Sequence, residues 1–236
     1  MIRPRRLALL LAVLGLSVGL VACTSQPTPH LLNRLPEKTH PTQCRSNVPG
    51  HAGYPTSTAA PSKADARILA EAADAEKAAM PSAEFWSLIS TMHGSVSDAA
   101  MKRLKAALEA GPTSDLAPFE TRLDLSLYEL DDECRLDWYD KNDPSGLGHL
   151  ADDDFLYVRT DTIAAGEKTY EAAIAHDTLP WGTVDAADDD GEDLLYVSEE
   201  AAHHAGIKDR AFYHEAKFDD LYETATNPIG WPDAGS

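Results

Sequence analysis

Residues 116–134 read LAPFETRLDLSLYELDDEC, and this stretch decides the fold. Its apolar side chains recur every three or four residues, at Leu116, Phe119, Leu123, Leu127, Leu130 and Cys134. This spacing places them on one stripe of an α-helix, because 3.6 residues complete a turn. Pro118 is tolerated in the first turn of such a helix. We therefore predict a central helix that begins near Ser114 or Asp115 and carries the core of the domain.

The segments on both sides of this stretch also show helical spacing, and strand-like runs of Val, Ile and Thr are almost absent. Glycines near the predicted helix ends, at 94, 111, 166 and 206, mark where helices stop. We predict an all-α fold, a single compact domain of about six or seven helices at residues 81–225. A linker helix at 63–80 precedes it, a final helix runs over 210–225, and a loose tail follows at 226–236.

The first 23 residues resemble a bacterial lipoprotein signal peptide. A basic start precedes an uncharged run, residues 7–21, and the segment ends in Leu20-Val21-Ala22-Cys23. The run is shorter than the about 20 residues of an ordinary membrane span. The resemblance implies that residues 1–22 are removed and that the Cys23 thiol is acylated. An uncleaved anchor helix is the alternative, and either one tethers the chain to a membrane.

Residues 23–62 are rich in Pro, Thr, Ser and Gly, with few large apolar side chains. Such a segment buries too little surface to offset its ordering entropy, so we expect a disordered, flexible stalk. Cys44 lies in this stalk and Cys134 in the domain, and an exported location permits a disulfide between them. Two unpaired thiols are the alternative, because the sequence gives no distance between the two residues.

The chain is strongly acidic, with a formal charge of −19. Removal of the signal would take away three arginines and leave 17 basic against 39 acidic residues, a charge of −22. This balance excludes a nucleic-acid partner, since it offers no basic footprint. A charged partner of the domain should be cationic: a metal ion, a basic peptide or a basic protein face.

One cluster of residues could form a ligand site. Asp152, Asp153 and Asp154 open a predicted helix that contains Arg159, so acids and a guanidinium could gather there with Trp86 as an aromatic wall. The alternative is structural: the acids favour the helix N-terminus and Arg159 forms an ion pair on the helix surface.

Histidines offer a weaker signal. His203, His204 and His214 could supply imidazoles, but adjacent side chains on a helix point about 100° apart and do not easily share one ion. The sequence contains no His-Glu-x-x-His, no Gly-x-Ser-x-Gly and no Cys-x-x-Cys. We therefore assign no metal site, no cofactor and no catalytic residue.

Three segments together resemble a bacterial family, the domain of unknown function DUF4240. They are Phe85-Trp86-Ser87-Leu88-Ile89, the stretch from Gly148 to Arg159, and Glu192-Asp193-Leu194-Leu195-Tyr196-Val197. The resemblance spans roughly Pro81 to Gly206. Val158 stands where the family usually has an aromatic residue, and Thr160 to Thr162 where it tends to have Trp. The family has no established activity, so the resemblance supports the domain and leaves its function open.

Together these features predict a lipid-anchored protein on the extracytoplasmic face of the cell membrane. Its domain is expected to be a noncatalytic binding or interaction module at the cell envelope, with an unidentified protein partner there. The alternative is an envelope-associated hydrolase with an Asp/Arg site, in which Asp152, Asp153 or Arg159 would lie near the centre.

Overall fold

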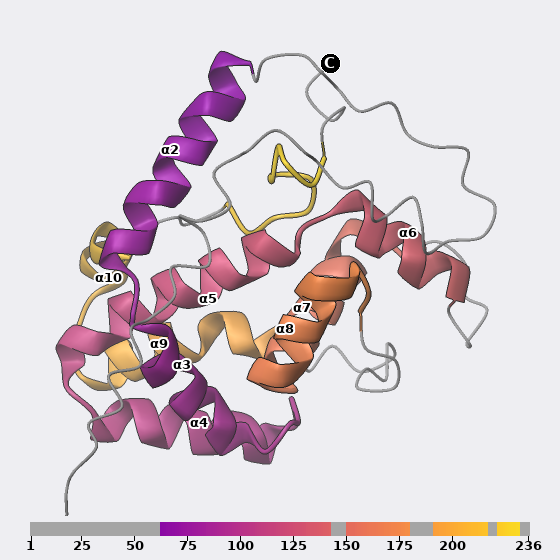
Figure 1. Cartoon of the computed structure of the whole chain (residues 1–236). Helices are drawn as coiled ribbons and strands as arrows, with labels where there is room; N and C mark the ends of the chain where they lie inside the picture. The colour runs from indigo at the N-terminus through magenta and orange to yellow at the C-terminus, as the bar shows by residue number, and fades with distance from the viewer. Residues whose placement is uncertain (1–61, 143–149, 180–190, 217–220, 232–236) are drawn as a thin grey trace, which may run out of the picture.

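The computed structural model describes residues 62–142, 150–179, 191–216 and 221–231 (Figure 1). Within these ranges all regular structure is helical, which confirms the all-α prediction. The nine α-helices found there are α2 (Lys63–Ala78), α3 (Ser82–Ile89), α4 (Asp98–Ala110), α5 (Leu116–Leu130), α6 (Glu133–Asn142), α7 (Asp152–Ala164), α8 (Glu167–His176), α9 (Asp193–His204) and α10 (Asp209–Glu215).

Helix α5 is the centre of the fold, as its apolar stripe predicts. Leu123, Leu127 and Leu130 are fully buried in the main core. The opposite side of α5 is buried as well, because Leu125 and Tyr128 pack against α2 in a second, smaller core. Helices α3, α7, α8, α9 and α10 also contact α5. A helix buried on nearly all sides must lie in the middle of the domain.

Helices α3 and α4 lie on either side of Gly94, one of the glycines predicted to mark a helix end. Gly94 and His93 before it have φ angles of +74° and +59°, which end the first helix in the left-handed region. Arg103 of α4 reaches back and donates to the carbonyl oxygens of Thr91 and Met92, at 2.9 Å each. These carbonyls end a short 3-10 turn and have no partner within it. Helix α4 then packs along α9.

The segment predicted as a linker helix, α2, lies against the domain. Arg122 of α5 makes a two-pronged ion pair with Glu76 of α2, at 2.8 and 2.9 Å, and donates to the Met80 carbonyl at 2.8 Å. Both side chains of the pair are mostly buried. A bidentate pair of this kind holds two helices in one register, so α2 is part of the folded body.

The stripe predicted to run from Leu116 to Cys134 on one helix is divided between two. Helix α5 ends at Leu130, Asp131 adopts an extended conformation with ψ of 94°, and α6 begins at Glu133. The break adds a helix beyond the six or seven expected for the domain. Its cause lies almost 100 residues further along the chain, in the tail.

Residues 226–231, predicted to be part of a loose tail, are packed against the break between α5 and α6. Asn227 and Gly230 are buried, and the Glu133 amide donates to the Gly230 carbonyl at 3.2 Å. A methyl group added to Gly230 would lie 2.1 Å from the Asp131 carbonyl oxygen, so only glycine fits here. The last predicted helix, 210–225, is also shorter: α10 ends at Glu215, and residues 221–231 form turns.

The signal segment 1–22, most of the stalk 23–62, Cys23 and Cys44 lie outside the described residues. Cys134 is disulfide-bonded, but its partner is not among the described residues, and its pairing with Cys44 stays a prediction. Among the described helices, none combines the length and apolarity needed to cross a membrane.

Candidate functional site

The three acids at the start of α7 lie on the surface. Asp152, Asp153 and Asp154 are all exposed. The Asp154 carboxylate accepts a hydrogen bond from the Ala151 amide at 3.2 Å. This contact satisfies one of the amide groups that the first turn of a helix leaves without a partner, and the negative charges complement the helix dipole. The acids thus stabilise the N-terminus of α7, as the structural alternative expected.

Arg159 is not on the surface with them, because its side chain is 0 % exposed. Its guanidinium donates to the carbonyl oxygens of Leu127 at 3.1 Å and Tyr222 at 2.8 Å, and to the Thr224 hydroxyl at 3.0 Å. The guanidinium also lies 4.9 Å from the centre of the Phe155 ring. The predicted ligand group therefore does not assemble, and the expected surface ion pair is a buried one.

The anionic partner of Arg159 is Asp131, at 3.8 Å, and Asp131 is also fully buried. Its carboxylate accepts four hydrogen bonds from residues 225–231: from the amides of Ala225, Thr226 and Asn227 and from the Trp231 indole, at 2.8–3.1 Å. Burial raises the pKa of Asp131, while Arg159 and these donors oppose the rise. Because the neighbours that contact this carboxylate are donors, they favour its ionised form.

The tail and Arg159 together complete the C-terminal end of α5. The last carbonyls of a helix have no partner within the helix, and a buried helix end needs donors from elsewhere. Arg159 supplies one to Leu127, the Asn227 amide group supplies one to Tyr128, and Arg135 supplies one to Glu129, at 3.0–3.1 Å. Arg159 and Asp131 thus form a structural pair that closes the fold.

Arg135 belongs to a second buried ionic cluster beside the first. It is 4 % exposed and contacts Asp177 at 3.3 Å and Asp132 at 3.9 Å. Asp132 accepts from the Cys134 amide at 2.8 Å and so begins α6. Burial raises the pKa of Asp132 to about 6. This cluster fixes α6 against the end of α8, where Asp177 has a φ of +49°.

Trp86 lies in the core, away from the three acids. Its ring contacts Phe85 and Tyr170, with ring centres 4.9 and 5.1 Å apart. The Tyr170 hydroxyl donates to Glu129 at 2.5 Å. Core packing thus accounts for the aromatic residues that the family pattern places at the start of α3.

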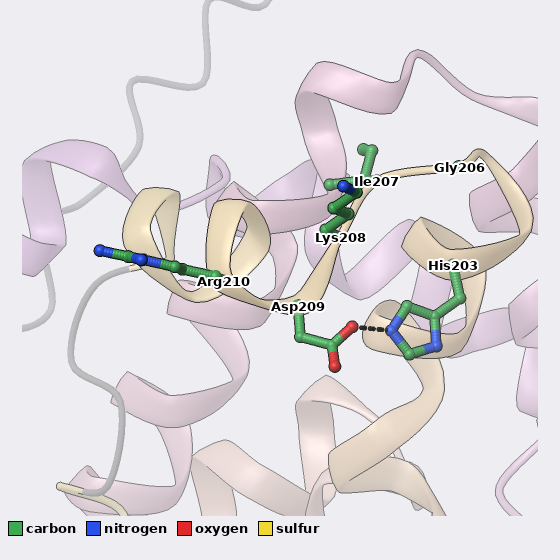
Figure 2. A pocket seen from close by; sticks show the side chains of 6 residues that line it. All are labelled: His203, Gly206, Ile207, Lys208, Asp209 and Arg210. Carbon is green, nitrogen blue, oxygen red and sulfur yellow. Dashed lines mark hydrogen bonds and ion pairs between the residues drawn. The ribbon is translucent and has the colours of Figure 1, made fainter.

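A different group of polar residues does come together, where α9 meets α10. His203 of α9 contacts Asp209, the first residue of α10, through Nε2, and the same nitrogen lies 3.7 Å from Glu199 Oε1 (Figure 2). The His203 hydrogen bond lowers the pKa of Asp209. The group borders an open depression lined by His203, Gly206, Ile207, Lys208, Asp209 and Arg210.

Sequence reasoning missed this group because it compared the histidines only with one another. His204, next to His203, does point elsewhere and pairs with Glu109 of α4 at 3.0 Å. The available signal was Glu199, four residues before His203 and therefore on the same helix face. Asp209 could not be added from spacing alone, because the turn at Gly206, with φ of +80°, brings it close.

Comparisons with known proteins add a family but no activity. Neither curated proteins nor solved structures give a match. One family model matches residues 80–203, a span that starts just before α3 and ends within α9. The match covers more than half of the 236 residues. The chain therefore belongs to the family described as protein of unknown function DUF4240.

Proposed function

We propose that this chain is a lipoprotein, held on the extracytoplasmic face of the cell membrane by lipid on Cys23, and that its helical domain is a noncatalytic binding module at the cell envelope. The proposed anchor rests on the sequence: an uncharged run ends at Leu20-Val21-Ala22-Cys23. Each buried methylene of an acyl chain contributes about 0.8 kcal/mol, so two or three chains hold a domain without help from its surface.

One observation carries the binding role over the hydrolase alternative. A pocket that gathers Arg159 with the neighbouring acids would favour that alternative, but the Arg159 guanidinium is buried and directed to Leu127, Tyr222 and Asp131. A group that holds the end of α5 and the tail in place cannot also approach a substrate without opening the core. Arg159 therefore has a structural role, and this favours the binding module over the hydrolase.

The charge of the domain indicates the kind of partner. The chain has 39 acidic and 20 basic residues, and the three exposed acids at the start of α7 present a local concentration of negative charge. Such a surface attracts a basic protein face and repels anionic lipid headgroups. The partner we propose is therefore an envelope protein with a basic surface.

The test is crosslinking in intact cells, with the chain retrieved from the membrane fraction. We expect one recurring crosslinked protein, which should be lost when Asp153 is changed to Asn. Asp154, which bonds the Ala151 amide, stays in place in this variant, so the start of α7 is kept. Asp98→Asn, at the exposed start of α4, is the matched control and should retain the partner.

Two results would count against the proposal. One is repeated failure to recover any partner from cells in which the chain is abundant. The other is a turnover of envelope material by the purified chain that Asp153→Asn abolishes, because this result would restore the hydrolase alternative.

A further inference from the structure

We propose that Glu199, His203 and Asp209 bind one divalent transition-metal ion, of the zinc class, at the junction of α9 and α10. The ligand atoms would be His203 Nε2 and one carboxylate oxygen from each acid. These three atoms lie within 4.8 Å of one another. The inference does not depend on the lipid anchor or on the envelope partner.

The backbone sets these side chains close together. Glu199 and His203 are four residues apart on α9, so they lie one above the other on one face of the helix. Gly206 turns the chain, and Asp209 then begins α10 opposite His203 (Figure 2). Two ligands from one helix turn and a third from the next element form a three-sided arrangement.

The distance between Glu199 and His203 suits a metal ion, and Asp209 can reach one by turning outward. Zinc lies about 2.0–2.2 Å from imidazole nitrogen and carboxylate oxygen, so ligand atoms on the same ion are separated by a little over 3 Å. Glu199 Oε1 is 3.7 Å from His203 Nε2, close to this separation, whereas the Asp209 oxygen is nearer to Nε2 than two ligands of one ion would be. Because the His203 and Asp209 side chains are both exposed, their rotation can bring these separations to the value that an ion requires.

The contact between His203 and Asp209 is a hydrogen bond, which a metal ion would have to replace. At this range only a proton fits between the imidazole nitrogen and the carboxylate oxygen, so a metal ion would replace that proton once the Asp209 side chain turns outward. The hydrogen bond from the Tyr213 hydroxyl to Glu199 Oε2, at 2.6 Å, leaves Oε1 for His203. Carboxylates that bind metal ions usually accept such a hydrogen bond from a neighbouring side chain.

The donor set also selects the ion. An imidazole with two carboxylates suits Zn²⁺ and its neighbours, whereas Ca²⁺ and Mg²⁺ prefer oxygen ligands alone. His203 and Asp209 are 49 % and 65 % exposed, so water would fill the remaining positions. Lys208 and Arg210 border the same depression, but the Arg210 side chain extends away from His203 (Figure 2). Their charges would offset part of the acidic attraction.

The proposal is tested by Zn²⁺ titration, followed by calorimetry, of the untagged full chain purified in detergent. Wild type should bind one more equivalent of Zn²⁺ than His203→Ala. Asp209→Asn should weaken the same site by about tenfold or more, since loss of even an indirect partner costs about 10–100-fold. Excess Mg²⁺ or Ca²⁺ should not displace the ion. All of these side chains are at least partly exposed, so the variants should fold.

His204→Ala is the matched control. It removes the neighbouring exposed histidine of the same helix, which pairs with Glu109, and should leave Zn²⁺ binding unchanged. The proposal is overturned if wild type binds no Zn²⁺. It is equally overturned if His203→Ala and His204→Ala bind the ion as wild type does, which would place binding elsewhere in the chain and leave only a surface ion pair here.

Discussion

Replacement of Arg159 by Met should destabilise the domain by about 4 kcal/mol. Met keeps the apolar length of the side chain but removes the charge and the donors to Leu127 and Tyr222. Removing one partner of a buried ion pair costs about 3–5 kcal/mol, because the other charge stays buried without compensation. The loss is large against a total stability of about 5–15 kcal/mol. At about 2–4 °C per kcal/mol, Tm should fall by roughly 8–16 °C.

The assay is urea denaturation of the full chain in detergent, followed by circular dichroism. Arg67→Met is the matched control, since Arg67 pairs with Glu71 at 3.5 Å on the exposed side of α2. An exposed pair contributes under about 1 kcal/mol, so this variant should resemble wild type. The double variant Asp131→Asn with Arg159→Met should lose less free energy of unfolding than the two single variants do in sum. The difference should be about 1–3 kcal/mol. A cost for Arg159→Met close to that of the control, or strict additivity in the double variant, would refute the structural role of the pair.

Three further predictions concern the same end of α5. Gly230→Ala should lower the free energy of unfolding, measured by urea denaturation, by about 1–3 kcal/mol, because the new methyl group would lie 2.1 Å from the Asp131 carbonyl oxygen. Unchanged stability would contradict the packing of residues 226–231 against the end of α5. Ala225→Gly should raise stability by about 0.5–1 kcal/mol, since Ala225 has a φ of +66° that disfavours an L side chain, and a lower Tm would argue against this conformation. Burial raises the pKa of Asp132 from 3.8 to about 6, so the folded protein holds this proton more tightly than the unfolded chain. The resulting stability is fully present below the unfolded pKa and is lost as pH rises through about 6, by up to about 3 kcal/mol. Between pH 4 and 7, wild type should therefore lose more stability than Asp132→Asn, as measured by Tm; parallel pH profiles would rule out the shift.

Local patterns account for most of the helices. The stripe on α5 and the glycines that end its neighbours act within a few residues, so their spacing predicts both elements and turns. Local spacing could not predict where α5 ends. Asp131 takes an extended conformation because amides at Ala225, Thr226 and Asn227 bind its carboxylate. A contact across almost 100 residues leaves no local pattern.

The predicted position of the Arg159 side chain is wrong for a different reason. Grouping Arg159 with the acids before it overlooks its spacing, four residues after Phe155 and four before Ile163. All three share one helix face, and both apolar partners are fully buried. This spacing predicts an inward guanidinium, which then needs a buried anion. The sequence contains that signal, but it does not identify Asp131 as the anion.

The most direct test of the proposed role is the mass of the N-terminal peptide of the chain recovered from bacterial membranes. We expect a peptide that begins at Cys23 and carries two or three acyl chains. Cys23→Ala should leave the protein unlipidated with its signal uncleaved. A mature chain that begins elsewhere, or an unmodified Cys23 on a chain found in the soluble fraction, would contradict the lipid-anchored envelope module.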